Sequence, residues 1–204
     1  MEEKIEKLLS ELKRRRMDAE FFQAKEELLA YIKKLVPEGA TVTWGGSMTL
    51  SQAGVTDMLK NGPYKVLDRA DCKNHEEAHE LMHKAFFSDY YFMSTNAMTE
   101  DGKLVNIDGN GNRVAALIYG PANVVVVTGI NKLVKDEAEA MDRVKNLAAP
   151  VNARRLNMPT PCVKTGRCGH CAGDGTICCH TVITRLSRHP GRIKVLIVNE
   201  TLGF

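Results

Sequence analysis

The feature that most constrains the fold of this sequence is an alternation of short apolar segments with longer segments of helical period. Residues 123–128 (NVVVVT) and 193–198 (IKVLIV) are continuous apolar runs, which are typical of strands buried on both faces of a parallel sheet. Other segments carry apolar residues three and four positions apart, which predicts amphipathic helices. The predicted helices are residues 24–36, 49–60, 74–87 and 136–149. Strands that alternate with such helices predict an α/β sheet with helices on both faces.

The remaining elements are predicted from local patterns. Strands are predicted at residues 17–23, 40–44, 64–67 and 89–93. Residues 104–107 and 113–118 are predicted to form a hairpin across the Gly-rich turn at 108–111. The chain has 204 residues and no internal repeat, so we predict a single domain over residues 1–204. Its N-terminal helix covers about residues 1–16, and a cysteine-rich loop covers about residues 160–180.

Nothing in the sequence predicts a membrane segment. The longest apolar stretch, residues 114–127, is interrupted by Gly120, Pro121 and Asn123 and is too short to span a bilayer. The N-terminal segment MEEKIEKLLSELKRRR is highly charged and lacks the apolar core of a signal peptide. We therefore expect a soluble, cytoplasmic protein without a membrane span.

Charge is unevenly distributed along the chain. The formal net charge is +3, but residues 150–194 hold eight Lys or Arg against the single acid Asp174, a local balance of +7. Five of the six cysteines lie in the same segment. A basic block beside thiols favours thiolates and attracts anions, although a solvated basic surface is the alternative. The expected partner is a small anionic ligand, and no nucleic acid is expected.

A glycine turn separates the strand at 40–44 from the following helix. The sequence TVTWGGSMTL places Gly45 and Gly46 where backbone N–H groups can approach a ligand, and Ser47 or Thr49 can cap the helix. An anion can bind at such a helix start, at the carboxyl end of a strand. We therefore predict that Gly45, Gly46, Ser47 and Thr49 bind ligand, the alternative being a capped turn with no ligand.

Polar residues follow three other predicted elements. They are Ser94, Asn96 and Glu100 after the strand at 89–93, Asn110, Asn112 and Arg113 after the Gly turn, and Asn131, Lys132 and Lys135 after the strand at 123–128. From these we select Asn96, Asn112, Arg113 and Lys135 as ligand-binding residues.

A histidine pattern in the helix at 74–87 resembles a zinc protease motif. Both 75–79 and 79–83 match H-E-x-x-H, in which two histidines share one helix face. We interpret His75, His79 and His83 as a solvated helix flank, because no Gly-x-x-His follows and another stripe faces the core. That stripe is Ala78, Leu81, Met82, Ala85 and Phe86.

Four cysteines with short spacings lie in the loop at 160–180. Cys162, Cys168, Cys171 and Cys178 fall within 17 residues, and thiolates at this spacing suit a tetrahedral zinc ion or an iron–sulfur cluster. Only one C-x-x-C pair is present, so the paired knuckles of a zinc ribbon are missing. Cys179 and His170 are spare ligands, and unliganded reduced thiols are the alternative.

Several segments together resemble a known family. They are TVTWGGSMTL, MSTNAMTEDGKLVNIDGNGNRVAALIYGPANVVVV, GINKLVKD, AAPVNARRL, TPCVKTGRC and IKVLIVNETLGF. They are similar to the lactate-utilisation (LUD) domain family, in its short single-domain members, over about residues 13–204. The resemblance implies a three-layer Rossmann-like α/β fold similar to ribose-5-phosphate isomerase and CoA-transferases. It also implies a link to bacterial oxidation of L-lactate to pyruvate beside iron–sulfur subunits.

The resemblance bears on individual residues as well. Cys162, Cys168, Cys171 and Cys178 fall at cysteine positions of the family pattern, whereas Cys179 is extra and the three histidines are outside it. By analogy with the CoA-transferase-like relatives, Glu100 is a weak candidate for a nucleophile or base. Its neighbours Asp101 and Gly102 also fit a plain exposed turn. The family identifies no catalytic residue, so the resemblance leaves open whether the chain is an enzyme.

These observations lead to one principal hypothesis about function and two alternatives. The principal hypothesis is a LUD-domain protein that binds a small anionic ligand and a cysteine-bound [4Fe–4S] cluster, with zinc as the alternative metal. It would act in electron transfer from lactate or a similar hydroxy acid, with iron–sulfur redox subunits as partners. The alternatives are an enzyme acting on a sugar phosphate or CoA thioester with a structural zinc clip, and a non-catalytic assembly subunit. A homo-oligomer is compatible with each.

Overall fold

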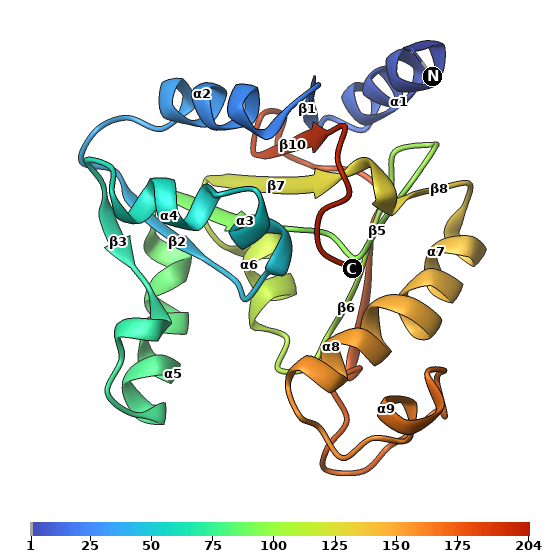
Figure 1. The fold of residues 1–204 in the computed structure, drawn as a ribbon. Coiled ribbons are helices and arrows are strands. Elements are labelled where there is room, and N and C mark those ends of the chain that lie inside the picture. The colour runs from blue at the N-terminus through green and yellow to red at the C-terminus, as the bar shows by residue number, and fades with distance from the viewer. Residues whose placement is uncertain (1) are drawn as a thin grey trace.

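The computed structural model describes residues 2–204, which form two β-sheets and the helices around them (Figure 1). The larger sheet has six strands, and every neighbouring pair in it is parallel. In spatial order its strands are β1 (Asp18–Phe22), β10 (Ile193–Val198), β7 (Asn123–Gly129), β4 (Tyr90–Met93), β2 (Thr41–Trp44) and β3 (Lys65–Leu67). The smaller sheet has four short strands, β8 (Leu133–Val134), β5 (Ala97–Thr99), β6 (Leu104–Asp108) and β9 (His180–Thr184).

Helices cover both faces of the larger sheet and one side of the smaller. They are α1 (Glu2–Arg14), α2 (Lys25–Leu35), α3 (Met48–Gln52), α4 (Val55–Lys60), α5 (His75–Lys84), α6 (Asn112–Tyr119), α7 (Glu137–Arg143), α8 (Ala149–Arg155) and α9 (Pro161–Thr165). Short 3-10 turns are η1 (Arg69–Asp71), η2 (Ala85–Phe87) and η3 (Ile130–Lys132), and the π-helical segment η4 (Val144–Ala148) joins α7 to α8. In Figure 1, α1 and α2 lie along the top, while α7, α8 and α9 gather at the lower right.

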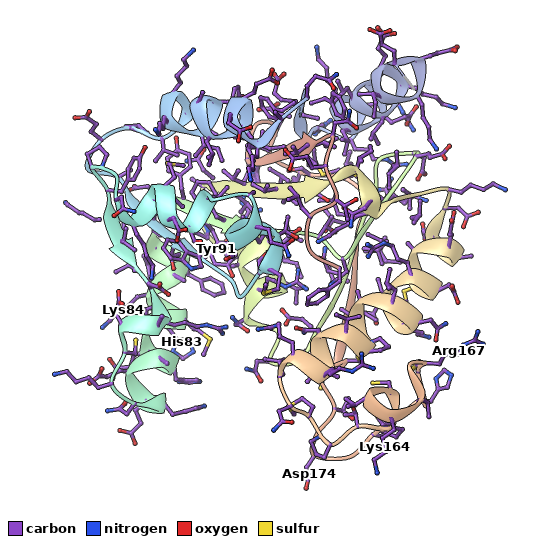
Figure 2. All side chains as sticks on the ribbon, viewed as in Figure 1. His83, Lys84, Tyr91, Lys164, Arg167 and Asp174 are labelled. Atoms are coloured by element: carbon purple, nitrogen blue, oxygen red, sulfur yellow. The ribbon has the colours of Figure 1, made fainter. Side chains whose placement is uncertain are left out.

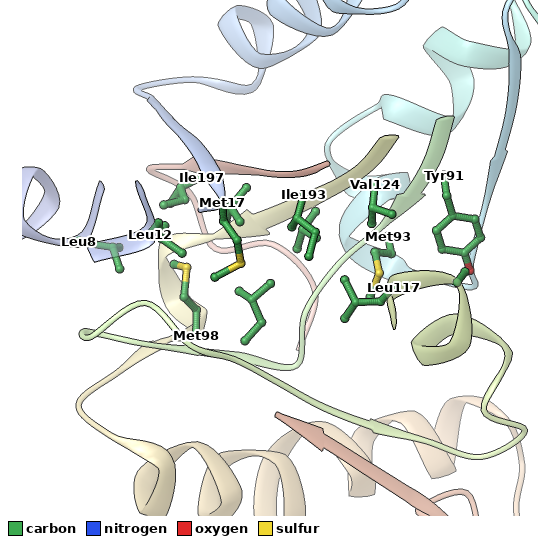
Figure 3. Close-up of a cluster of buried hydrophobic side chains, with 14 of the residues drawn as sticks. Leu8, Leu12, Met17, Tyr91, Met93, Met98, Leu117, Val124, Ile193 and Ile197 are labelled. Atoms are coloured by element: carbon green, nitrogen blue, oxygen red, sulfur yellow. The ribbon is translucent and has the colours of Figure 1, made fainter. Parts of the chain in front are cut away.

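The central strand β7 shows why both faces of the larger sheet need cover. Val124 and Val126 belong to one apolar cluster, and Val125 and Val127 belong to another, because successive side chains of a strand point to opposite faces. The first cluster packs β7 and β10 against α1 and α6 through Leu8, Leu12 and Leu117, among others (Figure 3). The second includes Leu28 and Ile32 of α2, Leu50 of α3 and Leu59 of α4. The predicted three-layer α/β fold is therefore confirmed.

The smaller sheet has its own apolar cluster, which we did not predict. Val105 of β6 and Val134 of β8 pack against Ala140 of α7 and Val144 of η4. This places α7 and α8 beyond the carboxyl ends of β4 and β7, since β5 and β8 follow those strands directly in the chain. The smaller sheet therefore forms a wall beyond the carboxyl ends of these strands of the larger sheet.

The predicted hairpin at 104–107 and 113–118 is wrong. Residues 112–119 form α6, and β6 pairs antiparallel with β5 on one side and with β9, from much later in the chain, on the other. The carboxylate of Asp108 accepts hydrogen bonds from the backbone N–H groups of Arg113 and Val114, both at 3.1 Å, and so caps this helix from outside. Gly111, at φ +81°, makes the turn between the two.

The predicted helix at 49–60 is interrupted, and the one at 136–149 is longer than expected. Gly54 adopts φ +73° and separates α3 from α4. The second helix continues through η4 and α8 to Arg155. Among residues 2–204, no helix has the length and apolar character needed to cross a membrane.

Candidate functional site

A cavity of about 440 Å³ lies where three strands of the larger sheet end. Since β2, β4 and β7 are parallel neighbours, their carboxyl ends meet at one edge, which is where open α/β sheets bind ligands. Each end contributes residues to the cavity lining, nearly all of them polar. They are Gly46, Ser47 and Thr49 after β2, Ser94, Thr95 and Asn96 after β4, and Lys132 after β7. The other walls include Arg69, Asp108, Asn112, Arg113, Asn152, Arg155, Asp174, Thr176, Ile177 and Phe204.

The amine of Lys132 is the most unusual group in the cavity. Only 3% of the residue is exposed, and Nζ donates hydrogen bonds to Thr49 Oγ1 at 2.7 Å, Ser94 Oγ at 3.1 Å and the Thr95 carbonyl at 3.2 Å. Burial, together with the positive charges of Arg143 and Arg113, lowers the pKa of Lys132 from 10.5 to about 7. Within residues 2–204, no carboxylate lies at salt-bridge distance from this amine. The cavity therefore holds a buried amine whose hydrogen-bond partners among the described residues are neutral.

This environment predicts a distinctive pH dependence of stability. Between about pH 7 and 10.5 the unfolded chain carries a proton on Lys132 that the folded protein lacks, so this group makes the free energy of unfolding rise with pH. The rise is about 1.4 kcal/mol per pH unit, or about 3 kcal/mol from pH 7 to pH 9.5. In Lys132→Met this contribution is absent, so the stability of the variant relative to the parent falls over that range.

Urea unfolding at pH 7 and pH 9.5 measures the difference. Lys135→Met is the matched control, because Lys135 is exposed and its variant is expected to keep the pH slope of the parent. Equal slopes for the parent and Lys132→Met would contradict a low pKa at Lys132.

Arg113 connects several segments that line the cavity through its hydrogen bonds. Its Nη1 donates to Asn106 Oδ1 at 2.6 Å and to the Ser94 carbonyl at 3.1 Å, and its Nη2 donates to Asn96 Oδ1 at 3.1 Å and the Ile107 carbonyl at 2.9 Å. Only 12% of the side chain is exposed, and burial lowers the pKa of Arg113. Because four of its hydrogen bonds go to protein oxygens, Arg113 chiefly positions the residues that follow β4.

The glycine turn after β2 packs against the side chain of Arg113. Gly45 is buried, and a Cβ there would lie 2.8 Å from Tyr91 Oη, so this position requires glycine for close packing rather than for a ligand. Gly46 is exposed at the cavity, opposite the guanidinium of Arg69. The Ser47 hydroxyl caps α3 by accepting from the Leu50 N–H at 3.3 Å. Of the predicted turn residues, Gly46, Ser47 and Thr49 line the cavity and Gly45 lies behind them.

The cysteine loop forms part of the cavity wall through Asp174, Thr176 and Ile177. All six cysteines are free thiols. Burial, followed by the charges of Cys168, Cys162, Cys171 and Cys179, raises the pKa of the Cys178 thiol to about 11. The number and chemistry of the loop thiols suit zinc or an iron–sulfur cluster. Within residues 2–204, however, no three His, Cys, Asp or Glu side chains are arranged as a ready metal site.

Comparison with known families decides the identity of this fold. The family model described as "LUD domain" matches residues 5–198. The chain belongs to the LUD domain family. The resemblance of its motifs to this family is therefore confirmed, and with it a general link to lactate utilisation.

One similar solved structure supports the fold of this LUD domain. A DUF162 family protein from Deinococcus radiodurans matches with a TM-score of 0.55 at 15% identity, covering 97% of both chains. Ribose 5-phosphate isomerase A from Methanocaldococcus jannaschii matches 56% of each chain, with a TM-score of 0.35 at 20% identity. The eIF2B beta structure from Chaetomium thermophilum covers 57% of this chain and 45% of its own, with a TM-score of 0.41 at 12% identity. No curated protein matches this LUD domain significantly in sequence.

Two residues selected from the sequence lie away from the cavity. Glu100 forms an ion pair with Lys4 of α1 at 2.7 Å, and neither residue lines the cavity. The exposed Lys135 follows β8, where its backbone N–H donates to the Glu139 carboxylate at 2.7 Å. By contrast, Asn96, Asn112 and Arg113 all line the cavity, and their binding of a ligand stays a prediction.

The histidine helix of the LUD domain is also separate from the cavity. His75, His79 and His83 are exposed on α5, and the rings of His79 and His83 lie edge to face with centroids 4.6 Å apart. Figure 2 shows His83 and Lys84 at the C-terminal end of this helix, on the opposite side of the view from the cysteine-loop residues Lys164, Arg167 and Asp174. This exposure agrees with the interpretation of a solvated flank.

Two important parts of the site were not selected from the sequence. The sequence indicates Lys132 only as one of several polar residues after a strand and favours Lys135, whereas the 3-10 turn η3 directs Lys132 into the fold. The C-terminal residues were missed entirely: Phe204 lines the cavity, and Gly203 packs against Thr49 and Lys132. Gly203 adopts φ +63°, and a Cβ there would collide with the Thr49 hydroxyl.

Proposed function

We propose that this LUD domain binds a small 2-hydroxy or 2-oxo acid in the cavity, and acts in the oxidation of lactate or a similar hydroxy acid. The observation that carries the proposal is the buried amine of Lys132, which has no acidic partner within the described residues. A carboxylate ligand would supply the missing negative charge.

The charges around Lys132 support the same ligand class. Arg69 and Arg155 are exposed arginines at the cavity, on η1 and α8. Asp108 is already used by the backbone of α6, which leaves Asp174 on the cysteine loop as the other acid of the lining. The lining therefore carries an excess of positive charge, which favours an anion.

The size of the cavity favours a second candidate. A volume of about 440 Å³ lies within the usual range for small-molecule sites and exceeds what a three-carbon acid fills. A sugar phosphate or the acyl end of a CoA thioester would occupy more of it. The phosphate of a sugar phosphate suits Arg69 and Arg155, because arginine binds phosphate oxygens with two N–H groups at once.

The cysteine loop extends the proposal to a metal centre. Cys162, Cys168, Cys171 and Cys178 would hold an iron–sulfur cluster, which supplies one-electron transfer when bound, or a zinc ion, which would only brace the loop. The same loop contributes Asp174 and Thr176 to the cavity, so a ligand there would lie beside the thiols. Exposed basic residues of this loop, such as Lys164 and Arg167, suit the docking of an acidic redox partner or assembly partner (Figure 2).

Calorimetric titration with L-lactate, pyruvate and ribose 5-phosphate tests the ligand class. We expect one of the two three-carbon acids to bind, and Lys132→Met to weaken that binding at least tenfold, because the variant removes the cation from the cavity. Lys135→Met, a lysine removed only three positions away, is expected to bind as the parent does. Binding of ribose 5-phosphate alone would favour the second candidate, and equal affinities in both variants would contradict a role for Lys132.

A further inference from the structure

We propose that Lys132 captures the carbonyl carbon of a 2-oxo acid as an imine; this inference rests on the proposed function and adds covalent chemistry to it. It makes Lys132 a nucleophile rather than only a binding cation. The substrate class is narrowed from anionic ligands in general to acids with a carbonyl group next to the carboxylate.

The surroundings of the amine support this role. Lys132 Nζ lies at the junction of three strand ends, with Thr49 from the turn after β2 and Ser94 and Thr95 from the segment after β4. Its charged neighbours are Arg143 and Arg113, both of which bond to oxygens of the segment 94–96. A lysine becomes nucleophilic when burial or neighbouring cations favour its neutral form, and both causes operate here.

The two hydroxyls beside the amine suit the proton transfers of imine formation. The neutral amine attacks the carbonyl carbon, the C–N bond forms, and the carbonyl oxygen becomes a hydroxyl by taking a proton, giving a carbinolamine. Loss of that hydroxyl as water, with loss of the remaining nitrogen proton to the solvent or a nearby base, gives the neutral imine. No oxidant or reductant is needed. Thr49 and Ser94 can pass protons, because each hydroxyl both donates and accepts.

Because the Lys132 amine bonds to the carbonyl carbon of the substrate, the substrate carboxylate requires a different binding group. Arg69 and Arg155 line the same cavity, and their guanidinium groups suit a carboxylate. A 2-hydroxy acid such as lactate has no carbonyl carbon for the amine to attack. The structure therefore distinguishes the oxidised from the reduced member of such a pair, with only the oxidised acid held covalently.

Borohydride trapping tests this inference on the intact chain. The protein is incubated with pyruvate and sodium borohydride, which reduces an imine to a stable secondary amine, and the modified lysine is located by peptide mass spectrometry. We expect at least tenfold more adduct on Lys132 than on any other lysine, and none when L-lactate replaces pyruvate. Trapping is expected to increase from pH 6 to pH 8, as the neutral amine becomes more abundant.

Variants and a binding measurement separate the outcomes. Lys132→Arg keeps a cation but cannot form the imine, so it is expected to lose the adduct, whereas Lys135→Arg is expected to keep it. Adduct distributed over exposed lysines and unchanged in Lys132→Arg would overturn the inference, and mapping in the parent protein decides this even if the variant misfolds. Pyruvate binding by calorimetry without any adduct would refute the imine alone. Absence of binding by either acid would refute the proposed function as well.

Discussion

Replacing Arg113 with Met is expected to lower the free energy of unfolding by about 2–4 kcal/mol, because it leaves several buried acceptors without a donor. The side chain bonds Asn106 Oδ1, Asn96 Oδ1 and two backbone carbonyls, and its Nε lies 3.8 Å from the carboxylate of Asp108. Methionine fills a similar volume but donates no hydrogen bond. Urea denaturation followed by circular dichroism measures the change.

Arg155→Met provides the matched control for this prediction. Arg155 lines the same cavity but is exposed and bonds only to Asn152 of its own helix, so its loss is expected to change stability by no more than about 0.5 kcal/mol. If the two variants were equally stable, Arg113 would not be the group that joins β4, β6 and α6.

Serine in place of Cys162, Cys168, Cys171 or Cys178 is expected to remove most of the metal that the protein binds after anaerobic purification. Each substitution replaces one thiolate of the proposed donor set with a hydroxyl that binds iron and zinc poorly. Elemental analysis gives the metal content, and visible absorbance with a brown colour distinguishes an iron–sulfur cluster from zinc.

Cys72→Ser is the control, because Cys72 follows η1 and lies outside the cysteine loop. This variant is expected to retain the metal content of the parent. Equal metal content in all five variants would mean that the loop thiols do not form a metal centre.

The parallel sheet could be predicted because its signal is local and strong. In β7 and β10, four or more consecutive apolar residues can be buried only when both faces of the strand are covered. The smaller sheet gave no such signal, since β5 and β8 contain three and two residues. Its pairing of β6 with β9 joins segments far apart in the sequence, and no local pattern indicates it.

Residues of the site could be predicted only where the end of a strand could be located in the sequence. The residues that follow such an end lie at the carboxyl ends of the parallel strands, where the cavity is. The ends of β2 and β4 could be located in the sequence, and Gly46, Ser47, Thr49 and Asn96 all line the cavity at these ends, while their binding of a ligand stays a prediction. After β7 the chain enters a 3-10 turn, and periodicity does not reveal which of the two lysines faces inward. The same limit applies at residues 108–113. There the side chain of Asp108 caps α6 and favours a helix over the expected hairpin.

The order of strands in the larger sheet has a consequence for how the chain is assembled. The strand β10 lies between β1 and β7, so β1 at the start of the chain cannot join the sheet until residues 193–198 are present. During synthesis, the segment with α1 and β1 therefore waits until residues 193–198 have been made before it can dock. Such long-range pairing slows folding and exposes apolar surface in the interval. Gly203 and Phe204 come after β10 in the chain, so they add their part of the cavity wall at the same late stage.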